Sequence, residues 1–301
     1  MFFNTRKHAA SSPLRQAAQE AAADLPALLL AAERAAAHVQ FGQHRQRKAG
    51  NGERFWQFRP YESHDRPQDI DWRQSGKGDK IYIRQREWQT PQTALFWCSS
   101  GPGMDFHSAP TLPTKAQAAH ILCLALAMLM TRAGEQIGTL GQAQRGRSDL
   151  AVERLAENLL LPETPEDLPT QIASAFPRFT TLVLCGDFLS PIAEIENSLL
   201  TLAPAESPIT LLQILDPAEI SLPYEGRAFF ETPDHAARTH IANIDSIRAA
   251  YQERIAAHCG ALHQFCTQRR WRYLLHRTDM PAEGTLHRLW LMLSGQEGPM
   301  P

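Results

Sequence analysis

Arginine and aspartate residues are interleaved with aromatic rings over one short stretch of this sequence, residues 58–73. The charged members are Arg59, Arg66 and Arg73 together with Asp65, Asp69 and Asp71, and the rings include Phe58, Tyr61 and Trp72. A guanidinium group binds a carboxylate through two parallel hydrogen bonds, and such pairs tolerate partial burial. We therefore predict an ion-paired, aromatic motif, which either anchors this segment on the rest of the fold or contacts a partner.

The pair Gly76-Lys77, shortly after this motif, raises the question of a phosphate-binding loop. The Walker pattern requires a glycine five positions before the Gly-Lys pair and a serine or threonine after the lysine. Asp71 and Gly78 stand at these two positions. Residues 75–80 are therefore expected to form a glycine-rich turn, and nucleotide hydrolysis is not expected.

Residues 44–59 mix basic and aromatic side chains in the way that single-stranded nucleic-acid binders do. The first 90 residues carry 15 Lys and Arg against 10 Asp and Glu, whereas the remainder carries 15 against 22. The net charge of the chain is -2, and the rings are clustered rather than spaced, which argues against nucleic acid. A basic N-terminal region that binds a protein partner is favoured, and nucleic-acid binding through residues 44–59 remains the alternative.

Five scattered cysteines, with no Cys-x-x-Cys pair, indicate reduced thiols and a cytoplasmic protein. Cys98 and Cys185 fall in apolar runs and are expected to be inert core residues. Cys259, His263 and Cys266 share one face of a predicted helix, but the apolar stripe there favours core packing over a zinc site. No signal peptide is recognised, and the most apolar run of the chain is too short to cross a bilayer.

Apolar runs that predict buried strands alternate with helical periodicity along the second part of the chain. The predicted strands span residues 93–98, 136–140, 181–185, 209–215, 227–231 (after a hairpin turn at 225–226) and 272–276. The predicted helices span residues 114–133, 149–160, 191–202, 242–268 and 282–293. This alternation predicts an α/β fold with a mostly parallel, Rossmann-like sheet that carries helices on both faces.

The chain of 301 residues is long enough for one large domain or two modest ones. Residues 1–90 are predicted to form an N-terminal segment and residues 91–301 the α/β domain. Within the first segment we expect an Ala-rich helix over 9–39, an exposed basic loop over 42–54 and, after the Arg–Asp motif, an edge strand over 81–86.

The motifs of the chain resemble those of a bacterial family called domain of unknown function 58. The matching residues, in chain order, are Gly42, His44, Gly50, Gly52, Arg59, Tyr61, Asp65, Ile70-Asp71-Trp72, Ser75, Cys185-Gly186-Asp187-Phe188-Leu189, Leu215-Asp216-Pro217-Ala218-Glu219, Leu222-Pro223 and Gly226. Because they keep the family's order from about residue 40 to about 280, the resemblance is specific for the family. Members of this family accompany MoxR-type AAA+ ATPases.

The resemblance implies a von Willebrand factor A-like sheet with a metal-ion-dependent adhesion site. In that site, oxygen ligands come from an Asp-x-Ser-x-Ser motif after the first strand, a threonine, and an aspartate on a third loop. In this sequence Ser99, Gly101 and Gly103 stand at the first three positions and Asp187 at the last. Because one carboxylate and two hydroxyls are missing, the site is expected to be degenerate, and only weak Mg²⁺ binding with the help of Asp105 stays open.

No arrangement of a nucleophile with its base can be singled out in the sequence, so a non-enzymatic protein is expected. The resemblance implies an adaptor that acts beside a MoxR-type AAA+ ATPase in remodelling, assembly or maturation of other proteins. No cofactor and no membrane contact are predicted. The alternatives are the nucleic-acid-binding module described above and a Mg²⁺-dependent adhesion-type binder.

Overall fold

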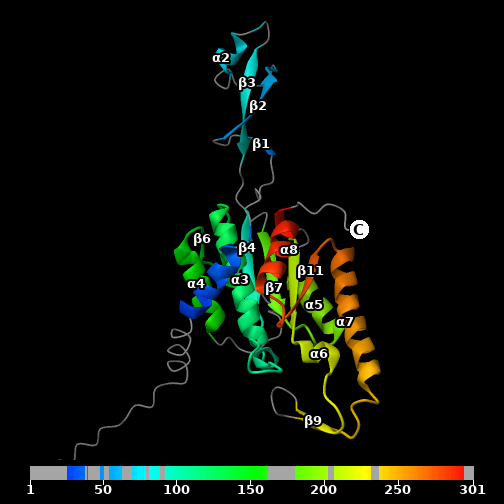
Figure 1. The fold of residues 1–301 in the computed structure, drawn as a ribbon. Coiled ribbons are helices and arrows are strands. Elements are labelled where there is room, and N and C mark those ends of the chain that lie inside the picture. The colour runs from blue at the N-terminus through cyan, green and yellow to red at the C-terminus, as the bar shows by residue number, and fades with distance from the viewer. Residues whose placement is uncertain are drawn as a thin grey trace, which may run out of the picture. The chain divides into compact units, whose positions relative to one another are not determined.

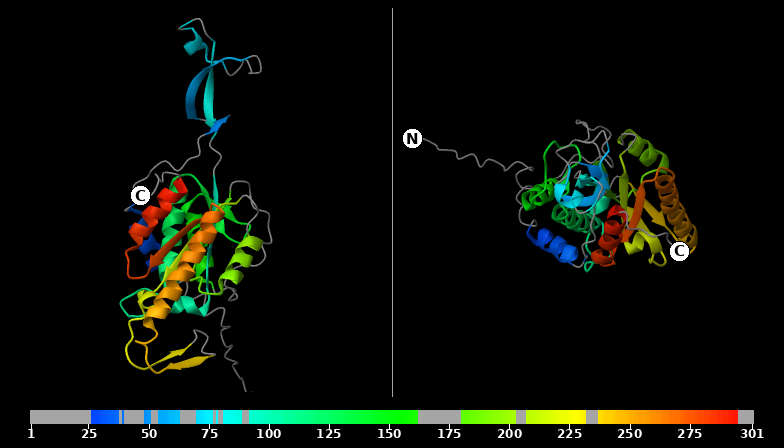
Figure 2. Two further views of the ribbon diagram at one scale, coloured as in Figure 1. Left: turned by 90° about the vertical axis from the view of Figure 1, so that its right-hand side faces the viewer. Right: turned by 90° about the horizontal axis from the view of Figure 1, so that it is seen from above.

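The computed structural model describes residues 26–37, 39, 48–50, 54–62, 70–76, 78, 81–88, 92–161, 180–202, 207–231 and 237–294. The chain divides into two compact units. The small unit is Gly42–Pro91, and the α/β unit combines Met1–Phe41 with Gln92–Pro301. Figures 1 and 2 show the elements of each unit.

The α/β unit contains a six-stranded sheet in the order β11-β8-β7-β4-β5-β6. These strands are β4 (Thr93–Cys98), β5 (Gln136–Thr139), β6 (Arg145–Gly146), β7 (Thr180–Gly186), β8 (Ile209–Leu215) and β11 (Arg272–Arg277). All neighbouring pairs are parallel except β5 with β6. Counted from β4 in chain order, the arrangement is that of doubly wound sheets, 3-2-1-4-5-6. The predicted mostly parallel α/β sheet is confirmed.

Helices cover both faces of this sheet, as the view from above in Figure 2 shows. One face packs against α3 (Lys115–Arg132), α4 (Asp149–Leu160) and α8 (Ala282–Ser294), the other against α5 (Ile192–Leu202) and α7 (Arg248–Gln268). A hydrophobic core lies on each face of the sheet: the first core on the side of α3, α4 and α8, and the second core on the side of α5 and α7. Side chains of β4 alternate between them, since Ala94 and Phe96 lie in the first core and Leu95 and Trp97 in the second. Burial on both faces explains the continuous apolar runs of these strands.

Helix α3 lies in the middle of the first core and is buried on most of its circumference. Thr114 caps its start, accepting a hydrogen bond from the backbone N–H of Gln117 at 3.1 Å, while the Gln117 side chain accepts from the backbone N–H of Thr114. The apolar run Ile121–Met130 is thus a buried helix, as predicted. None of the helices in the described ranges combines the length and apolar character needed to span a bilayer.

A helix over residues 26–37 packs on the same core through Leu28, Ala32, Ala35 and Ala36. The predicted division at residue 90 assigns this helix to the N-terminal segment. The structure groups it with the α/β unit instead, since its apolar stripe is buried there. The part of the predicted helix before residue 26 lies outside the described residues.

The small unit holds a three-stranded antiparallel sheet in the order β1-β3-β2. Its strands are β1 (Lys48–Gly50), β2 (Arg54–Pro60) and β3 (Tyr82–Trp88). The strand predicted over residues 81–86 is present as β3, but it is the central strand of this sheet and not an edge strand, because β1 and β2 pair with its two sides. The exposed loop predicted for residues 42–54 is wrong at 48–50, because β1 hydrogen-bonds to the end of β3, with Lys48 opposite Trp88.

The hairpin of the α/β unit differs from its prediction. Strands β9 (Ala228–Glu231) and β10 (Arg238–Ile241) pair antiparallel, so the chain reverses between residues 231 and 238 rather than at 225–226. Gly226 does adopt a positive φ of 67°, but it leads into β9 and accepts a hydrogen bond from the Ile244 N–H. Because β10 continues to Ile241 and a turn follows it, α7 begins at Arg248 and not at the predicted residue 242.

Candidate functional site

The carboxyl ends of the parallel strands meet at one edge of the sheet, which we call the carboxyl edge. β4 is followed there by a 3-10 turn, η2 (Pro102–Asp105), and β8 by the short helix α6 (Pro217–Ser221). The strand order reverses between β4 and β7, because β5 lies beyond β4 on one side and β8 beyond β7 on the other. Doubly wound sheets bind their ligands outside the carboxyl ends at such a reversal point.

The side chain of Lys115 lies at this point and is held by two carboxylates. Its Nζ is 2.9 Å from Oδ2 of Asp187, directly after β7, and 2.6 Å from Oε1 of Glu219, in α6. The Lys115 side chain is 1% exposed, whereas the two acids are 20% and 17% exposed. A buried ammonium group stays charged only when it is paired and hydrogen-bonded, so these three residues form one ion-paired cluster.

Lys115 is the first residue of α3, where a positive charge is unfavourable in isolation. The N-terminus of a helix carries a partial positive charge, which favours anions there. The carboxylates of Asp187 and Glu219 offset this repulsion because two negative charges face one ammonium group. The lysine is thus held by tertiary contacts across 72 and 104 residues of sequence, and not by its own helix.

Glu219 is positioned by the way in which α6 begins. Asp216 caps this helix, accepting from the Ala218 N–H at 2.8 Å, and Pro217 occupies the first turn. Oε2 of Glu219 accepts from the Asp216 N–H at 2.9 Å, which completes a capping box and leaves Oε1 for Lys115. Burial raises the pKa of Glu219, although Lys115 acts in the opposite direction.

Two further residues extend this network along the carboxyl edge. The fully buried Asp216 accepts from the Ser108 N–H at 2.9 Å, which ties the segment after β4 to the end of β8. Gln213 of β8 donates to the Asp187 carbonyl at 2.8 Å and accepts from the Tyr273 hydroxyl of β11 at 2.5 Å. Polar groups within β8 and β11 and in the segments after β4, β7 and β8 are thereby connected.

The turn after β7 is held in an unusual backbone conformation. Phe188 has a φ of 47°, in the left-handed region that bulky residues rarely adopt. Its ring lies 6.4 Å from that of Trp97 (centroid to centroid), and its carbonyl oxygen is 2.6 Å from Nε2 of His258 on α7. These contacts maintain a strained turn next to Asp187, and strained turns of this kind cluster at functional sites.

The structure brings the predicted metal-site positions together, but with few oxygen ligands. Ser99, Gly101 and Gly103 follow β4 and Asp187 follows the adjacent β7, so all four lie at the reversal point. The Asp187 carboxylate binds an ammonium group instead, and Asp105 is exposed in η2. The residues present therefore do not fit Mg²⁺, which needs several oxygen ligands with carboxylate charge.

Lys115 and Glu219 are functional candidates that the sequence analysis did not identify. A signal for Glu219 was present, because Asp-Pro-x-Glu after a buried strand is a capping box and fixes where that carboxylate can lie. Lys115 had a weaker signal, a single charge directly after the cap Thr114 at the start of an apolar helix. Its pairing with residues far along the chain could not be predicted from spacing.

Within the Arg–Asp motif, the described residues show a capping role. Asp71 caps α2 (Trp72–Ser75) by accepting from the Gln74 N–H at 2.9 Å, and its own N–H donates to the Tyr82 carbonyl at 2.9 Å. The Ser75 hydroxyl donates to the Asp71 carbonyl at 2.8 Å and accepts from the Tyr82 N–H at 2.8 Å. These bonds tie α2 to β3, a role that the ion-pair interpretation did not include.

The other members of the motif are placed only in part. Trp72 is 69% exposed and Arg73 is also exposed, whereas the Tyr61 N–H donates to the Ile81 carbonyl. Asp65, Asp69 and the side chain of Arg59 lie outside the described part of the chain. The same holds for the side chains of the basic, aromatic stretch 44–59.

The predicted zinc alternative on α7 does not assemble. Cys266 is buried in the second core, whereas His263 is exposed and its ring contacts that of Tyr273 in a tilted arrangement, 5.6 Å between ring centroids. Among the residues that the structure describes, the one group of three metal-ligating side chains within reach of one another is Cys98, Cys123 and Cys185.

The fold and the carboxyl edge define an α/β protein of the doubly wound class. A model of the family described as "Protein of unknown function DUF58" matches residues 57–260, about two thirds of the chain. The chain therefore belongs to this family, as its motifs indicated. Comparison with the curated proteins and with the solved structures gave no match.

Proposed function

We propose that this chain is a non-enzymatic, protein-binding adaptor with a von Willebrand factor A-like α/β unit. It acts with a MoxR-type AAA+ ATPase in the assembly, remodelling or maturation of other proteins. The observation that carries the proposal is the position of Lys115 Nζ between Asp187 and Glu219, at the reversal point of the sheet. The strand order with a single antiparallel edge pair supports the von Willebrand factor A-like assignment.

Lys115 supplies at this edge the positive charge that a metal-dependent binder of this class takes from a cation. The ammonium group is part of the chain and is present whatever the Mg²⁺ concentration. Partner binding at this edge is therefore expected to be independent of Mg²⁺. Because the Lys115 side chain is 1% exposed, it organises the edge rather than contacting a partner. The contact surface must then come from the side chains around it.

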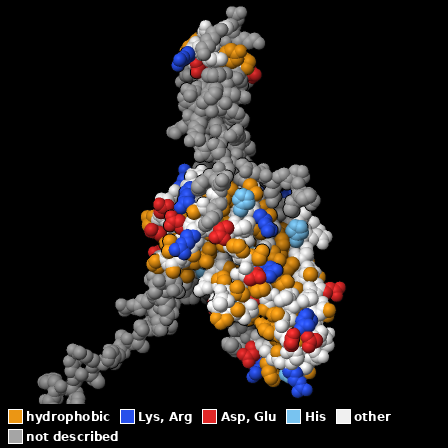
Figure 3. Space-filling model, in the orientation of Figure 1, with side chains coloured by type: hydrophobic (Ala, Val, Ile, Leu, Met, Phe, Trp, Pro, Cys, Tyr) orange, Lys and Arg blue, Asp and Glu red, His pale blue; other side chains and the backbone are white. Residues whose placement is uncertain are grey.

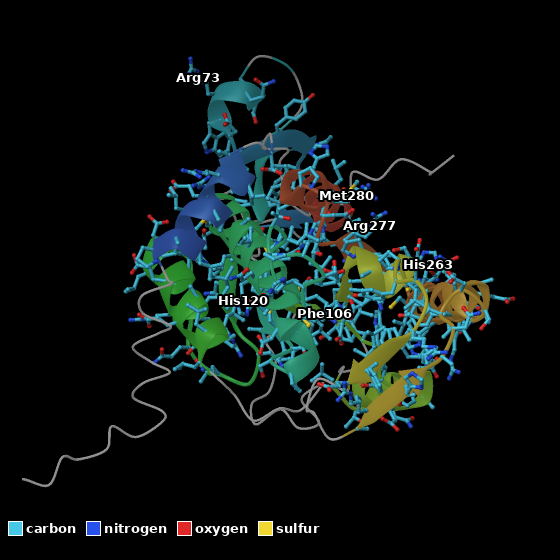
Figure 4. All side chains as sticks on the ribbon, turned by 60° about the horizontal axis from the view of Figure 1, so that its bottom comes forward. Arg73, Phe106, His120, His263, Arg277 and Met280 are labelled. Atoms are coloured by element: carbon cyan, nitrogen blue, oxygen red, sulfur yellow. The ribbon has the colours of Figure 1, made fainter. Side chains whose placement is uncertain are left out.

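Four partly exposed apolar side chains follow the ends of the strands β4, β7, β8 and β11, one after each strand. These residues, the apolar rim, are Phe106, Leu189 and Tyr224, each 38% exposed, and Met280, 54% exposed. Figure 4 brings the carboxyl edge forward and labels two of them, and Figure 3 shows apolar side chains exposed among charged ones on one face of this unit. Aromatic and other apolar anchors supply much of the binding energy in protein interfaces, which supports a protein partner.

Calorimetric titration with the MoxR-type ATPase of the same organism tests the proposal. The titrations are run with an ATP analogue or ADP, each with and without EDTA, and we expect nucleotide-dependent binding that survives EDTA. Leu189→Asp in the apolar rim should weaken binding, whereas Leu150→Asp on α4, at a side chain 51% exposed, should not. Absence of binding in every nucleotide state would remove the link to the ATPase.

A Mg²⁺-dependent adhesion-type binder is distinguished by the same titration. If EDTA abolishes binding while the ATPase still holds its nucleotide, and added Mg²⁺ restores it, the partner needs a metal at its interface, and Lys115 does not replace the cation. If binding is unchanged by both, the ammonium group of Lys115 suffices for this edge.

A further inference from the structure

Three thiols from three different elements meet in the first core, beneath the carboxyl edge. Cys98 ends β4, Cys185 lies opposite it on the neighbouring strand β7, and Cys123 reaches both from α3. The Sγ atom of Cys123 is 3.3 Å from that of Cys98 and 3.0 Å from that of Cys185. All three sulfur atoms lie within 4.8 Å of one another.

These cysteines lie in or against the first core, as expected for Cys98 and Cys185, but they also lie against one another. Cys123 is 1% and Cys185 0% exposed, so no solvent competes for their sulfur atoms. Cys98 is only partly buried, which leaves an approach to the cluster from its side. Apolar side chains would serve packing equally well, yet the fold directs three sulfur atoms at one point.

We propose that Cys98, Cys123 and Cys185 form a buried binding site for a soft, monovalent metal ion, of which Cu(I) is the biological example. This three-thiol site is separate from the carboxyl edge and does not depend on the proposed adaptor function. Thiolate sulfur is a soft ligand that selects Cu(I), zinc or iron–sulfur clusters over hard cations such as Mg²⁺. The choice among the soft ions follows from ligand number and charge.

The number of ligands favours an ion that accepts three. With metal–sulfur bonds of about 2.3 Å, a trigonal arrangement needs sulfur atoms about 4 Å apart, within the 3.0 to 4.8 Å that the three thiols span. Structural zinc is almost always bound by four protein ligands. No fourth His, Cys, Asp or Glu joins the group among the described residues.

The charge of the cluster also suits a monovalent ion. A monovalent ion is neutralised by one thiolate, whereas a divalent ion needs two, and uncompensated charge is costly among buried groups. Each thiol that becomes a ligand releases its proton to the solvent.

The test is an anaerobic titration of the reduced full-length protein with Cu(I) in the presence of a chromophoric Cu(I) chelator. We expect one ion bound per chain and sulfur as the only near neighbour of copper in X-ray absorption. Cys123→Ser should weaken the affinity by more than about tenfold, a loss that removing even supporting groups of metal sites produces. Cys259→Ser, at a half-buried cysteine of α7, is the matched control and should bind as the wild type does.

Three outcomes would overturn the proposal. They are a failure of the protein to withdraw Cu(I) from the chelator, equal affinity of the wild type and Cys123→Ser, and tighter binding of Zn²⁺ than of Cu(I) in parallel competition. Should circular dichroism show that Cys123→Ser is unfolded, Cys98→Ser at the partly exposed position replaces it with the same expectations.

Discussion

At the scale of single residues, the carboxyl edge depends on one lysine in an unfavourable position. Lys115 begins a helix, is removed from water and faces two acids that themselves would repel one another. Breaking a buried ion pair by removing one partner leaves uncompensated charge, which costs far more than the intact pair contributes. The three side chains are therefore coupled, and substitutions among them will not be additive.

Lys115→Met should lower the free energy of unfolding by about 3–5 kcal/mol, because two partly buried carboxylates lose their counter-charge. Urea denaturation followed by fluorescence measures this loss. The double variant Lys115→Met/Glu219→Gln should recover part of the stability, since only one carboxylate then remains. If the double variant is less stable by the full sum of the single effects, Lys115 and Glu219 do not act as one coupled unit.

Lys115→Ser should convert the edge into a weak cation site. The serine leaves space beside the carboxylates of Asp187 and Glu219, and hard divalent cations bind such oxygen ligands. Added Mn²⁺ should then raise the melting temperature of the variant by mass action and leave that of the wild type unchanged. A similar increase in both proteins would show that the cation binds elsewhere.

The buried His276 should make stability depend on pH. Its Nδ1 is 2.8 Å from the Thr285 hydroxyl, and burial lowers the pKa of His276 to about 4, although Asp279 opposes the shift. The unfolded chain binds a proton near pH 6.5 and the folded protein only near pH 4, so stability falls as the pH decreases through this window.

Urea denaturation at about pH 7.5 and about pH 5 measures the His276 effect, which should reach about 2 kcal/mol at the lower pH. His276→Asn should reduce the difference between the two pH values. His287→Asn, at an exposed position of α8, the helix that carries Thr285, should keep the pH dependence of the wild type. Equal pH dependence in all three proteins would contradict a neutral, buried His276.

At the scale of elements, the sequence predicted the strands and helices that are buried on both sides. The runs that became β4, β7 and β8 are mostly apolar, which is typical of strands covered on both faces. β1 and β10 escaped prediction because each is short and polar and is held by pairing with a partner strand. The position of the candidate site at the carboxyl edge could be predicted from the sequence. Its residues could not, because Lys115 and Glu219 are separated by 104 positions of sequence.

The cap of α6 is the element-level feature most open to test. Asp216→Ala removes the acceptor of the Ala218 N–H and leaves the Ser108 N–H without its carboxylate, so we expect a loss of about 2–4 kcal/mol in urea denaturation. Ser148, the N-cap of α4, makes no side-chain capping bond, and Ser148→Ala should therefore change stability by less than about 0.5 kcal/mol. Equal losses in the two variants would argue against the network.

At the scale of the whole molecule, the family match begins in β2 of the small unit and ends within α7 of the α/β unit. Residues 57–260 thus include parts of both units, so the family match covers both. Each unit also exposes a large ring, Trp72 in the small unit and Tyr224 in the apolar rim. These two rings are the candidates for contact with the proposed ATPase partner.

Trp72→Ser and Tyr224→Ser should show which of the two exposed rings contacts the proposed ATPase partner. Because both rings are exposed, neither substitution should change the melting temperature by more than a degree or two. We expect Tyr224→Ser to weaken ATPase binding in calorimetry and Trp72→Ser to leave it near the wild-type value. The reverse result would move the interface to the small unit.

The division of the chain makes the small unit an insertion, because the helix of residues 26–37 and strand β4 lie in the same core on either side of it. Bringing that helix back to the core across Gly42–Pro91, 50 residues, costs on the order of 3.5 kcal/mol of chain entropy if the insertion is unfolded. Pairing of β1 with β3 sets Lys48 opposite Trp88, so a folded insertion closes most of this loop in advance. Folding of the small unit thus lowers the entropy cost of bringing the helix of residues 26–37 to its core. The two units are therefore linked thermodynamically through the connectivity of the chain alone.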